Sequence, residues 1–183
     1  NREIYKMTSE EIDKLRLDGA PEPVPYLEDV LRIFRGRTPL LIELKTHGDN
    51  AARLTSKVCK LLKEYPDVQF CMESFDPRVL IWLRKNRPDI LRGQLSAKVI
   101  SSHKENGLSL PAAIMLTNLF SNFLARPDFI AYRLEDRDQL SFRLCRSLWK
   151  PQEFNWTVKS QEDADACLRD DRVIIFQDFP PQK

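Results

Sequence analysis

Short apolar runs alternate with amphipathic segments along most of the chain. The runs that predict strands span residues 40–45, 68–73, 90–95, 128–132, 154–158 and 173–176. Between the first two runs, Leu54, Val58 and Leu61 repeat with the period of a helix. Alternation of strand and helix is typical of a parallel α/β protein, which is either an open doubly wound sheet or a (β/α) barrel.

Capping residues predict where several helices begin. Thr8 and Glu11 have the T-x-x-E spacing of a capping box, before a short helix that ends near residue 15. Asp76 followed by Pro77 predicts an N-cap and a proline at the first helical position. Ser160 precedes an acidic first turn, so it is expected to cap a helix as well.

The segment 96–107 is the most polar part of the chain and predicts a loop. One helical region is expected after it, at roughly 111–124. That apolar stretch is too short and too interrupted by polar residues to span a bilayer, so we expect no stable membrane insertion. A buried or partner-packed helix is the commoner interpretation, and a peripheral membrane contact is the rarer one.

The first predicted strand turns polar at its end, in the sequence PLLIELKT at 39–46. Side chains alternate along a strand, so Glu43 and Lys45 are expected on one face. Charges at the end of an apolar strand need compensation. One interpretation is pairing with each other or with a neighbouring strand. The other is a carboxylate that binds a metal beside an ammonium that binds an anion, which suits a phosphate ester.

Polar residues recur where the predicted strands end. They are Glu43 and Lys45, Glu73 and Ser74, Gln94, Trp156 and Thr157, and Gln177 and Asp178. A barrel builds its active site at this carboxyl-terminal rim. The chain has no GxGxxG and no Walker A motif, which disfavours a nucleotide-binding open sheet.

Composition narrows the class of protein further. The 183 residues, 42% hydrophobic and 31% charged, suffice for one domain over 1–183 with a sizeable core. The formal charge is +2 with both signs interleaved, so we expect no nucleic-acid footprint. The four cysteines lack CxxC spacing, which favours reduced thiols and a cytoplasmic protein.

Three stretches together resemble the glycerophosphodiester phosphodiesterase family. They are PLLIELKT at 39–46, ESFDPRVLIWLRKNRPDILRGQL at 73–95 and NWTVKSQEDADACL at 155–168, in the family's order. The resemblance implies a TIM barrel that cleaves glycerophosphodiesters to glycerol 3-phosphate and an alcohol, using a divalent cation, Ca²⁺ or Mg²⁺.

The resemblance also implies roles for particular residues. Glu43 corresponds to a metal ligand, and Lys45 to a catalytic lysine that contacts the substrate phosphate. Trp156 corresponds to a tryptophan that lines the pocket. Glu73 and Gln94 match rim positions and are candidate substrate-binding residues.

The chain departs from the family pattern at its beginning. Family members start with a His-Arg-Gly strand, then a Glu-x-Asp strand and a His-Asp motif, and none of these is present. The two histidines, His47 and His103, lie in other contexts. A complete barrel takes about 250 residues, so the chain is expected to be an incomplete barrel of strands three to eight.

This departure leaves two hypotheses. The first is the C-terminal three quarters of a metal-dependent phosphodiesterase, inactive by itself because the acid–base histidines and most metal ligands are absent. His47 has two interpretations: it could replace the missing general base, or, as is more common, it is a loop histidine beside the site. The second is a shortened, non-catalytic module that binds an anion or a protein partner, with a homodimer covering the unpaired strand edges.

Overall fold

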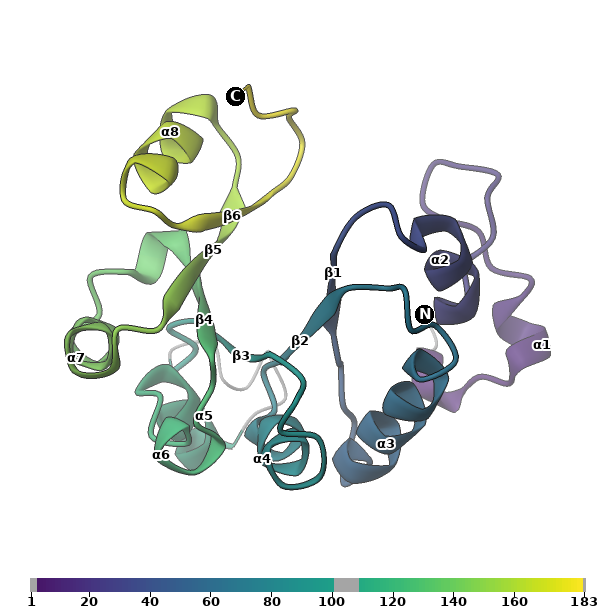
Figure 1. Ribbon diagram of the computed structural model, residues 1–183, viewed down its shortest axis with the longest axis horizontal. Helices are drawn as coiled ribbons and strands as arrows, with labels where there is room; N and C mark the ends of the chain where they lie inside the picture. Colours follow the sequence, from purple (N-terminus) through teal and green to yellow (C-terminus); the bar gives the residue numbers. More distant parts are fainter. Residues whose placement is uncertain (1–2, 101–108, 183) are drawn as a thin grey trace.

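The computed structural model describes residues 3–100 and 109–182, and its centre is a curled sheet of six parallel strands (Figure 1). The strands are β1 (Leu40–Glu43), β2 (Phe70–Ser74), β3 (Arg92–Ser96), β4 (Phe129–Arg133), β5 (Gln152–Val158) and β6 (Val173–Phe176). They are hydrogen-bonded in chain order, and every neighbouring pair is parallel. An order without reversal is that of a (β/α) barrel and not of a doubly wound sheet, so the prediction of an incomplete TIM-type barrel is confirmed.

Helices connect consecutive strands along the outside of the curl (Figure 1). The α-helices are α1 (Ser9–Ile12), α2 (Leu27–Phe34), α3 (Ala51–Leu62), α4 (Pro77–Asn86), α5 (Leu110–Thr117), α6 (Asn122–Ala125), α7 (Leu140–Trp149) and α8 (Gln161–Arg169). Two 3₁₀ turns, η1 (Ile4–Lys6) and η2 (Leu134–Asp136), complete the described elements. Among the described residues the sheet is open between β1 and β6, which each pair with one neighbour.

The largest hydrophobic core lies between the first strands and the helices α2 to α4. Leu31, Met72, Leu80 and Leu83 are completely buried there. Burial of one such side chain stabilises the fold by about 1.5–3 kcal/mol. The amphipathic segments predicted from the sequence therefore form helices whose apolar faces are buried in this core. The curl of the sheet is therefore held from its convex side.

The predicted helix caps are present. Thr8 and Glu11 form a reciprocal capping box at α1. The Asp76 carboxylate accepts the backbone N–H of Arg78 at 2.9 Å, at the start of α4. The Ser160 hydroxyl accepts the N–H of Asp163 at the start of α8. Each cap satisfies a backbone donor that the helix itself cannot satisfy.

Some predicted boundaries were wrong. The first strand ends at Glu43, so Lys45 lies in the following loop, and the second and third strands begin at Phe70 and Arg92 instead of two residues earlier. The helical region expected at 111–124 is two helices, because Leu119 adopts a left-handed φ of 57° that a continuous helix cannot contain. Most of the predicted polar loop, including His103, lies outside the described residues.

The four cysteines are free thiols, in agreement with the sequence prediction. Burial raises the pKa of the thiols of Cys59, Cys71, Cys145 and Cys167. Near neutral pH these thiols therefore stay in the protonated form, which is the weaker nucleophile. Within the described parts of the chain, no helix is long and apolar enough to cross a membrane.

Candidate functional site

Two carboxylates lie side by side at the carboxyl ends of β1 and β2. Glu43 and Glu73 are partners in the parallel register, so their side chains leave the sheet on the same face. Glu73 is only 5% exposed, and its Oε2 has no hydrogen-bond partner. Burial raises the pKa of the Glu73 carboxyl to about 7, and the negative charge of Glu43 adds to the effect. An unpaired buried oxygen beside a second carboxylate favours a proton or a cation at this point.

Lys45 follows this pair in the loop after β1. Its Nζ lies 3.6 Å from Oε2 of Glu43, and its side chain is 81% exposed. Such an exposed ion pair contributes little to stability because solvent screens it. The Glu43–Lys45 ion pair, which was one of the two interpretations of the sequence, is thus present. The Lys45 ammonium also has donors that an anion from solution can reach.

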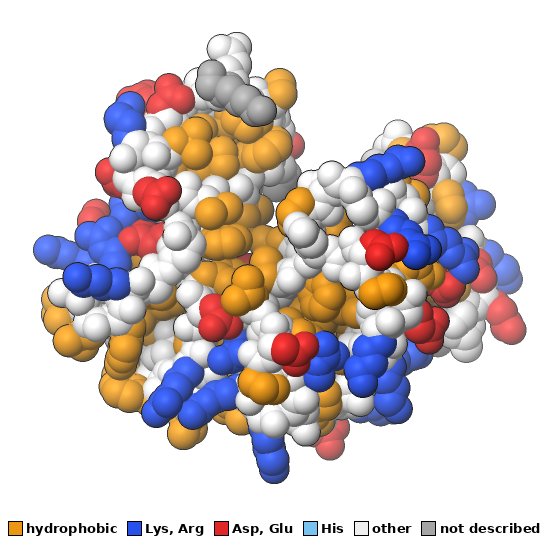
Figure 2. Space-filling model, viewed as in Figure 1, with side chains coloured by type: hydrophobic (Ala, Val, Ile, Leu, Met, Phe, Trp, Pro, Cys, Tyr) orange, Lys and Arg blue, Asp and Glu red, His pale blue; other side chains and the backbone are white. Residues whose placement is uncertain are grey.

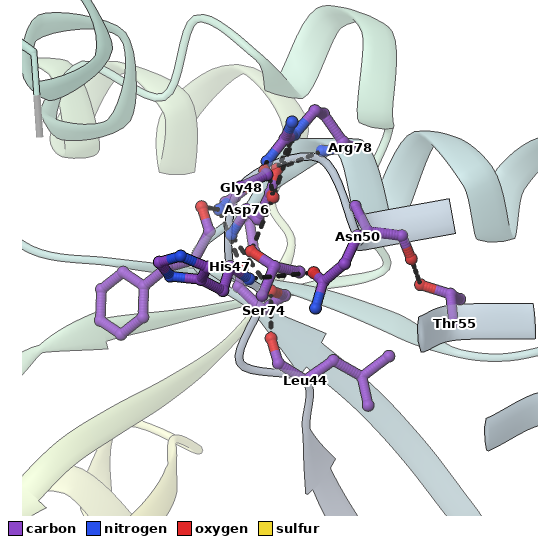
Figure 3. Close-up of polar contacts among 12 residues, drawn as sticks. Leu44, His47, Gly48, Asn50, Thr55, Ser74, Asp76 and Arg78 are labelled. Carbon is purple, nitrogen blue, oxygen red and sulfur yellow. Dashed lines mark hydrogen bonds and ion pairs between the residues drawn. The ribbon is translucent and has the colours of Figure 1, made fainter. Parts of the chain in front are cut away.

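Ser74 connects the loop after β1 to the end of β2 (Figure 3). Its hydroxyl donates to the carbonyl of Leu44 at 2.6 Å and accepts the backbone N–H of Asp76 at 3.1 Å. The N–H of Leu44 in turn donates to the carbonyl of Glu73 at 2.8 Å. These bonds continue the β1–β2 pairing past the last residue of β1 and restrain the backbone on both sides of Leu44.

Asp76 and Arg78 hold the remainder of this loop from the start of α4 (Figure 3). The Asp76 carboxylate accepts the Thr46 hydroxyl at 2.8 Å and the Arg78 side chain at 2.7 Å. Arg78 also donates to the carbonyl of Gly48 at 2.6 Å. Burial by itself raises the pKa of Asp76, but the hydrogen bonds from Arg78 and Thr46 outweigh it and leave that pKa below its usual value. Asp76 is therefore ionised at neutral pH and positions the segment that carries Lys45.

His47 lies in the same loop, where the sequence left a base and a loop histidine as alternatives. Its backbone N–H donates to Oδ1 of Asn50 at 2.9 Å (Figure 3). Its exposed ring stacks on that of Tyr5, with the centroids 3.4 Å apart and the planes inclined by 15°. This environment is that of a histidine packed against the N-terminal segment.

Gln94 is completely buried in the middle of β3, and not near the end of its strand as the sequence suggested. Its amide Nε2 donates to the backbone carbonyls of Ser74, at 3.1 Å, and Leu95, at 3.0 Å. Its Oε1 has no hydrogen-bond partner. The amide nitrogen thus supports the rim backbone, and the oxygen is the atom that Gln94 could offer to a ligand.

Trp156 lies in the C-terminal half of β5, opposite β2 across the curl. Its indole N–H donates to the carbonyl of Ala131 at 3.1 Å, and its ring meets the edge of Phe75 with 5.7 Å between centroids. The guanidinium of Arg133 lies 5.1 Å from the centroid of the indole ring. Phe75 follows β2, so this contact shows that the ends of β2 and β5 approach each other.

Arg133 is a rim residue that the sequence reasoning missed. It is the last residue of β4, is the register partner of Trp156, and has a side chain that is 40% exposed. One nitrogen lies 3.6 Å from a carboxylate oxygen of Asp136. The signal available in the sequence was an arginine directly after the apolar run FIAY, at the same place in its strand as the polar residues noted elsewhere. It provides a second cation at the rim that carries Lys45.

Glu43 and Glu73 fit a divalent cation in part. Hard cations take about six oxygen ligands, and two carboxylates supply up to four. The unpartnered Oε2 of Glu73 is the observation that favours an ion. Among residues 3–100 and 109–182, however, no group of three or more His, Cys, Asp or Glu side chains is placed to hold one. Water and a substrate phosphate would have to complete the coordination.

The fold and site define a class of protein before any comparison. Parallel strands in chain order, with charged side chains gathered at their carboxyl ends, are the architecture of TIM-barrel proteins that act on small molecules. No protein-family profile matches the chain, and no curated protein matches it in sequence.

Solved structures of glycerophosphodiester phosphodiesterases match the chain, and the chain has their fold. The enzyme of Parabacteroides distasonis is 16% identical, with a TM-score of 0.67 over 92% of this chain and 66% of that one. The enzyme of Agrobacterium tumefaciens is 18% identical, with a TM-score of 0.59 over 93% and 68%. A phosphodiesterase of Oleispira antarctica, solved with the product sn-glycerol-3-phosphate, is 14% identical, with a TM-score of 0.63 over 84% and 57%.

These likenesses confirm at the level of the fold the resemblance found in the sequence. At identities of 14–18% they establish the fold alone. The chain spans 57% of the Oleispira protein and 66% of the Parabacteroides protein, in agreement with an incomplete barrel.

Proposed function

We propose that the protein binds glycerophosphodiesters at the rim formed by β1, β2 and β5, as part of their hydrolysis to sn-glycerol 3-phosphate and an alcohol. The observation that carries the proposal is the carboxylate pair Glu43 and Glu73 beside the exposed ammonium of Lys45. The phosphodiesterase of Oleispira antarctica, which has a similar fold and was solved with sn-glycerol-3-phosphate, supports the choice of ligand.

Each rim residue has a role in this proposal. The ammonium of Lys45 donates to a phosphoryl oxygen and acts as the catalytic lysine. Glu43, with Glu73 beside it, contributes oxygens to Ca²⁺ or Mg²⁺, which when bound offsets the negative charge of the phosphoryl group. Trp156 presents an aromatic wall, and Oε1 of Gln94 accepts from a substrate hydroxyl.

General acid–base groups set the expected rate. Proton transfer by a positioned side chain contributes about 10²–10⁴-fold to such reactions. His47 is stacked on Tyr5, and the structure describes no other histidine. We therefore expect the 183-residue chain by itself to bind product and substrate but to turn substrate over negligibly.

The test measures ligand binding and turnover separately. Calorimetric titration with sn-glycerol 3-phosphate, in the presence of Ca²⁺, Mg²⁺ or EDTA, should show metal-supported binding. Lys45→Met should weaken that binding about tenfold, because hydrogen bonds to charged groups contribute about 1.5–3 kcal/mol and solvent screens this exposed one. The control variant Lys60→Met removes an exposed lysine from α3 and should bind normally.

Turnover is read from release of glycerol 3-phosphate from glycerophosphocholine and glycerophosphoethanolamine. Hydrolysis by the chain at the rate of a complete enzyme would contradict the expectation of negligible turnover. Failure to bind glycerol 3-phosphate under any of the three conditions would contradict the proposed site itself.

A second candidate is a non-catalytic barrel module that binds an anion or a protein partner. It is favoured by the edges of β1 and β6, which within the described residues have no strand on their outer sides. Exposed strand edges are usually covered or paired, and a homodimer would achieve this. Light scattering that gives a dimer, together with anion binding that needs no metal, would favour this candidate. With either function, the free thiols support the proposal of a cytoplasmic location.

A further inference from the structure

Large apolar side chains lie exposed side by side on the outer helices α6 and α7. We call them the α6–α7 face: Phe123, Leu124, Leu140, Leu144, Leu148 and Trp149. Leu148 is 71% exposed and Leu140 is 68% exposed. Single exposed apolar residues are ordinary, but a contiguous patch marks a binding surface. Figure 2 shows hydrophobic side chains gathered over these helices, with Lys and Arg side chains around them.

Helix α7 is apolar on two opposite sides. Phe142 and Cys145 are buried against the sheet. Leu140, Leu144 and Leu148 follow one another at i, i+4 and i+8 and are all exposed, so they form a stripe pointing away from that core. Only the side with Phe142 and Cys145 packs against the sheet. Each of the three leucines is more than half exposed, so most of the stripe contributes little to the packing of the described residues.

Helix α6 extends the apolar surface of α7. The rings of Phe123 and Trp149 meet edge to face with their centroids 4.9 Å apart. A hollow lined by Phe123, Cys145, Trp149 and Pro151 lies between the two helices. Trp149 adjoins Leu148 in the chain, so the surface continues from the aromatic pair into the leucine stripe.

The charge around this face is mainly positive, with the exposed acids Asp128 and Asp138 at the margins of its two segments. Segments 109–127 and 139–152 contain no aspartate or glutamate, although the chain has 27 acidic residues. Arg126, Arg143 and Lys150 are exposed there. The nearest acid in sequence after α7, Glu153, is buried and lies 3.2 Å from each of two arginines, one of them Arg146. The face is thus apolar, and the charges within its two segments are all positive.

We propose that the α6–α7 face docks the protein on the surface of an anionic phospholipid bilayer. Leucine and aromatic side chains enter the boundary between headgroups and acyl chains, while Arg and Lys contact lipid phosphates. The ring of Trp149 suits this depth, because its body is apolar and its N–H is polar. The helices lie on the surface and do not cross it, which agrees with the absence of a membrane-spanning helix among the described residues.

Charge argues against a second copy of the chain as the occupant. In a symmetric dimer the same patch lies on both sides of the interface. Two patches that each carry Arg126, Arg143 and Lys150 would then be brought together, and within these segments no acidic side chain could pair with them; Asp128 and Asp138 lie only at the margins. A bilayer that carries anionic lipid supplies the missing opposite charge.

This inference does not depend on the proposed hydrolysis. The α6–α7 face lies on the helices outside the sheet, and the candidate site lies at the carboxyl ends of β1, β2 and β5. The protein could fail to bind glycerol 3-phosphate and still bind vesicles, or the reverse, so the two failures are distinguishable.

The test is flotation of the protein with vesicles of phosphatidylcholine alone or of phosphatidylcholine with phosphatidylglycerol. We expect flotation only with the second kind, and a decrease as salt is raised. The variant Leu140→Gln/Leu144→Gln/Leu148→Gln changes only exposed side chains, so it should fold normally and lose at least tenfold in vesicle partitioning.

A matched control changes three exposed apolar residues elsewhere, Leu17→Gln/Ile33→Gln/Leu168→Gln, and should float as the unchanged protein does. Circular dichroism confirms folding of both variants. Arg143→Gln and Lys150→Asn should each reduce partitioning by about fivefold, because one Lys or Arg near an anionic surface contributes about 1 kcal/mol. Asparagine tolerates the positive φ of residue 150, so that change tests charge and not backbone strain.

Three results would overturn the proposal. One is equal flotation, or none, with the two kinds of vesicle. Another is an equal loss in the control variant. The third is a dimer that the leucine substitutions dissociate while vesicle binding is absent, which would assign the face to a second copy of the chain.

Discussion

Replacing Glu73 with glutamine should stabilise the fold in a pH-dependent manner. Burial and the charge of Glu43 raise the carboxyl pKa from an ordinary 4.5 to about 7. Below pH 4.5 the folded and unfolded states are both protonated, and the group costs nothing. Between pH 4.5 and 7 the folded state retains a proton that the unfolded state has lost, so the free energy of unfolding falls as pH rises.

The full cost is present above pH 7. The difference between 4.5 and 7 corresponds to about 3 kcal/mol. Glutamine has nearly the same shape and no charge, and no hydrogen bond to Oε2 is lost. Glu73→Gln should therefore raise the free energy of unfolding by up to about 3 kcal/mol at pH 8 and by only about 1 kcal/mol at pH 5.

Urea denaturation followed by circular dichroism at both pH values measures these differences. Glu64→Gln is the matched control, because Glu64 is exposed and its replacement should change stability little at either pH. The reasoning would be refuted by destabilisation at pH 8, or by a gain of the same size at pH 5 and pH 8. Either result would mean that the Glu73 carboxyl is not held in a repulsive, buried environment.

Three further predictions concern the candidate cation site, the packing of β3 and the cap of α8. Adding Ca²⁺ or Mg²⁺ at pH 8 should raise the melting temperature, because a ligand that binds only the folded state stabilises it. Glu43→Gln should abolish that rise. An unchanged rise in the variant would place the cation elsewhere. Gly93→Ala puts a Cβ 2.0 Å from Cε2 of Phe129 and should cost about 1–3 kcal/mol in a denaturant titration. Combining it with Phe129→Leu should recover part of the loss, and strict additivity would argue against the clash. Ser160→Ala removes the cap of α8 and should cost about 1 kcal/mol, whereas Ser160→Asp should retain the stability.

Local chemistry in the sequence was sufficient for much of the fold. Apolar runs and helical periods predicted all six strands, and Asp76 before Pro77 predicted the start of α4 to the residue. The polar residues expected at the strand ends include Glu43, which is the last residue of β1, and Lys45, which lies in the loop after it. These features depend on neighbours a few residues apart, which are present in the sequence itself.

Other features needed the tertiary structure. The division between α5 and α6 arises at Leu119, whose left-handed φ is not favoured by leucine and is held by the surrounding packing. The contact of Arg133 with Trp156 joins residues of different strands, and nothing in either local sequence indicates it.

The sequence by itself determined the order of strands and helices and the kinds of side chain at each strand end. The structure alone decided which of those side chains meet. Glu43 and Glu73 are separated by a whole helix, and their carboxylates are neighbours because of the β1–β2 register, which is set by hydrogen bonds across the sheet. The raised pKa of Glu73 follows from that register and from burial, and both are properties of the folded chain.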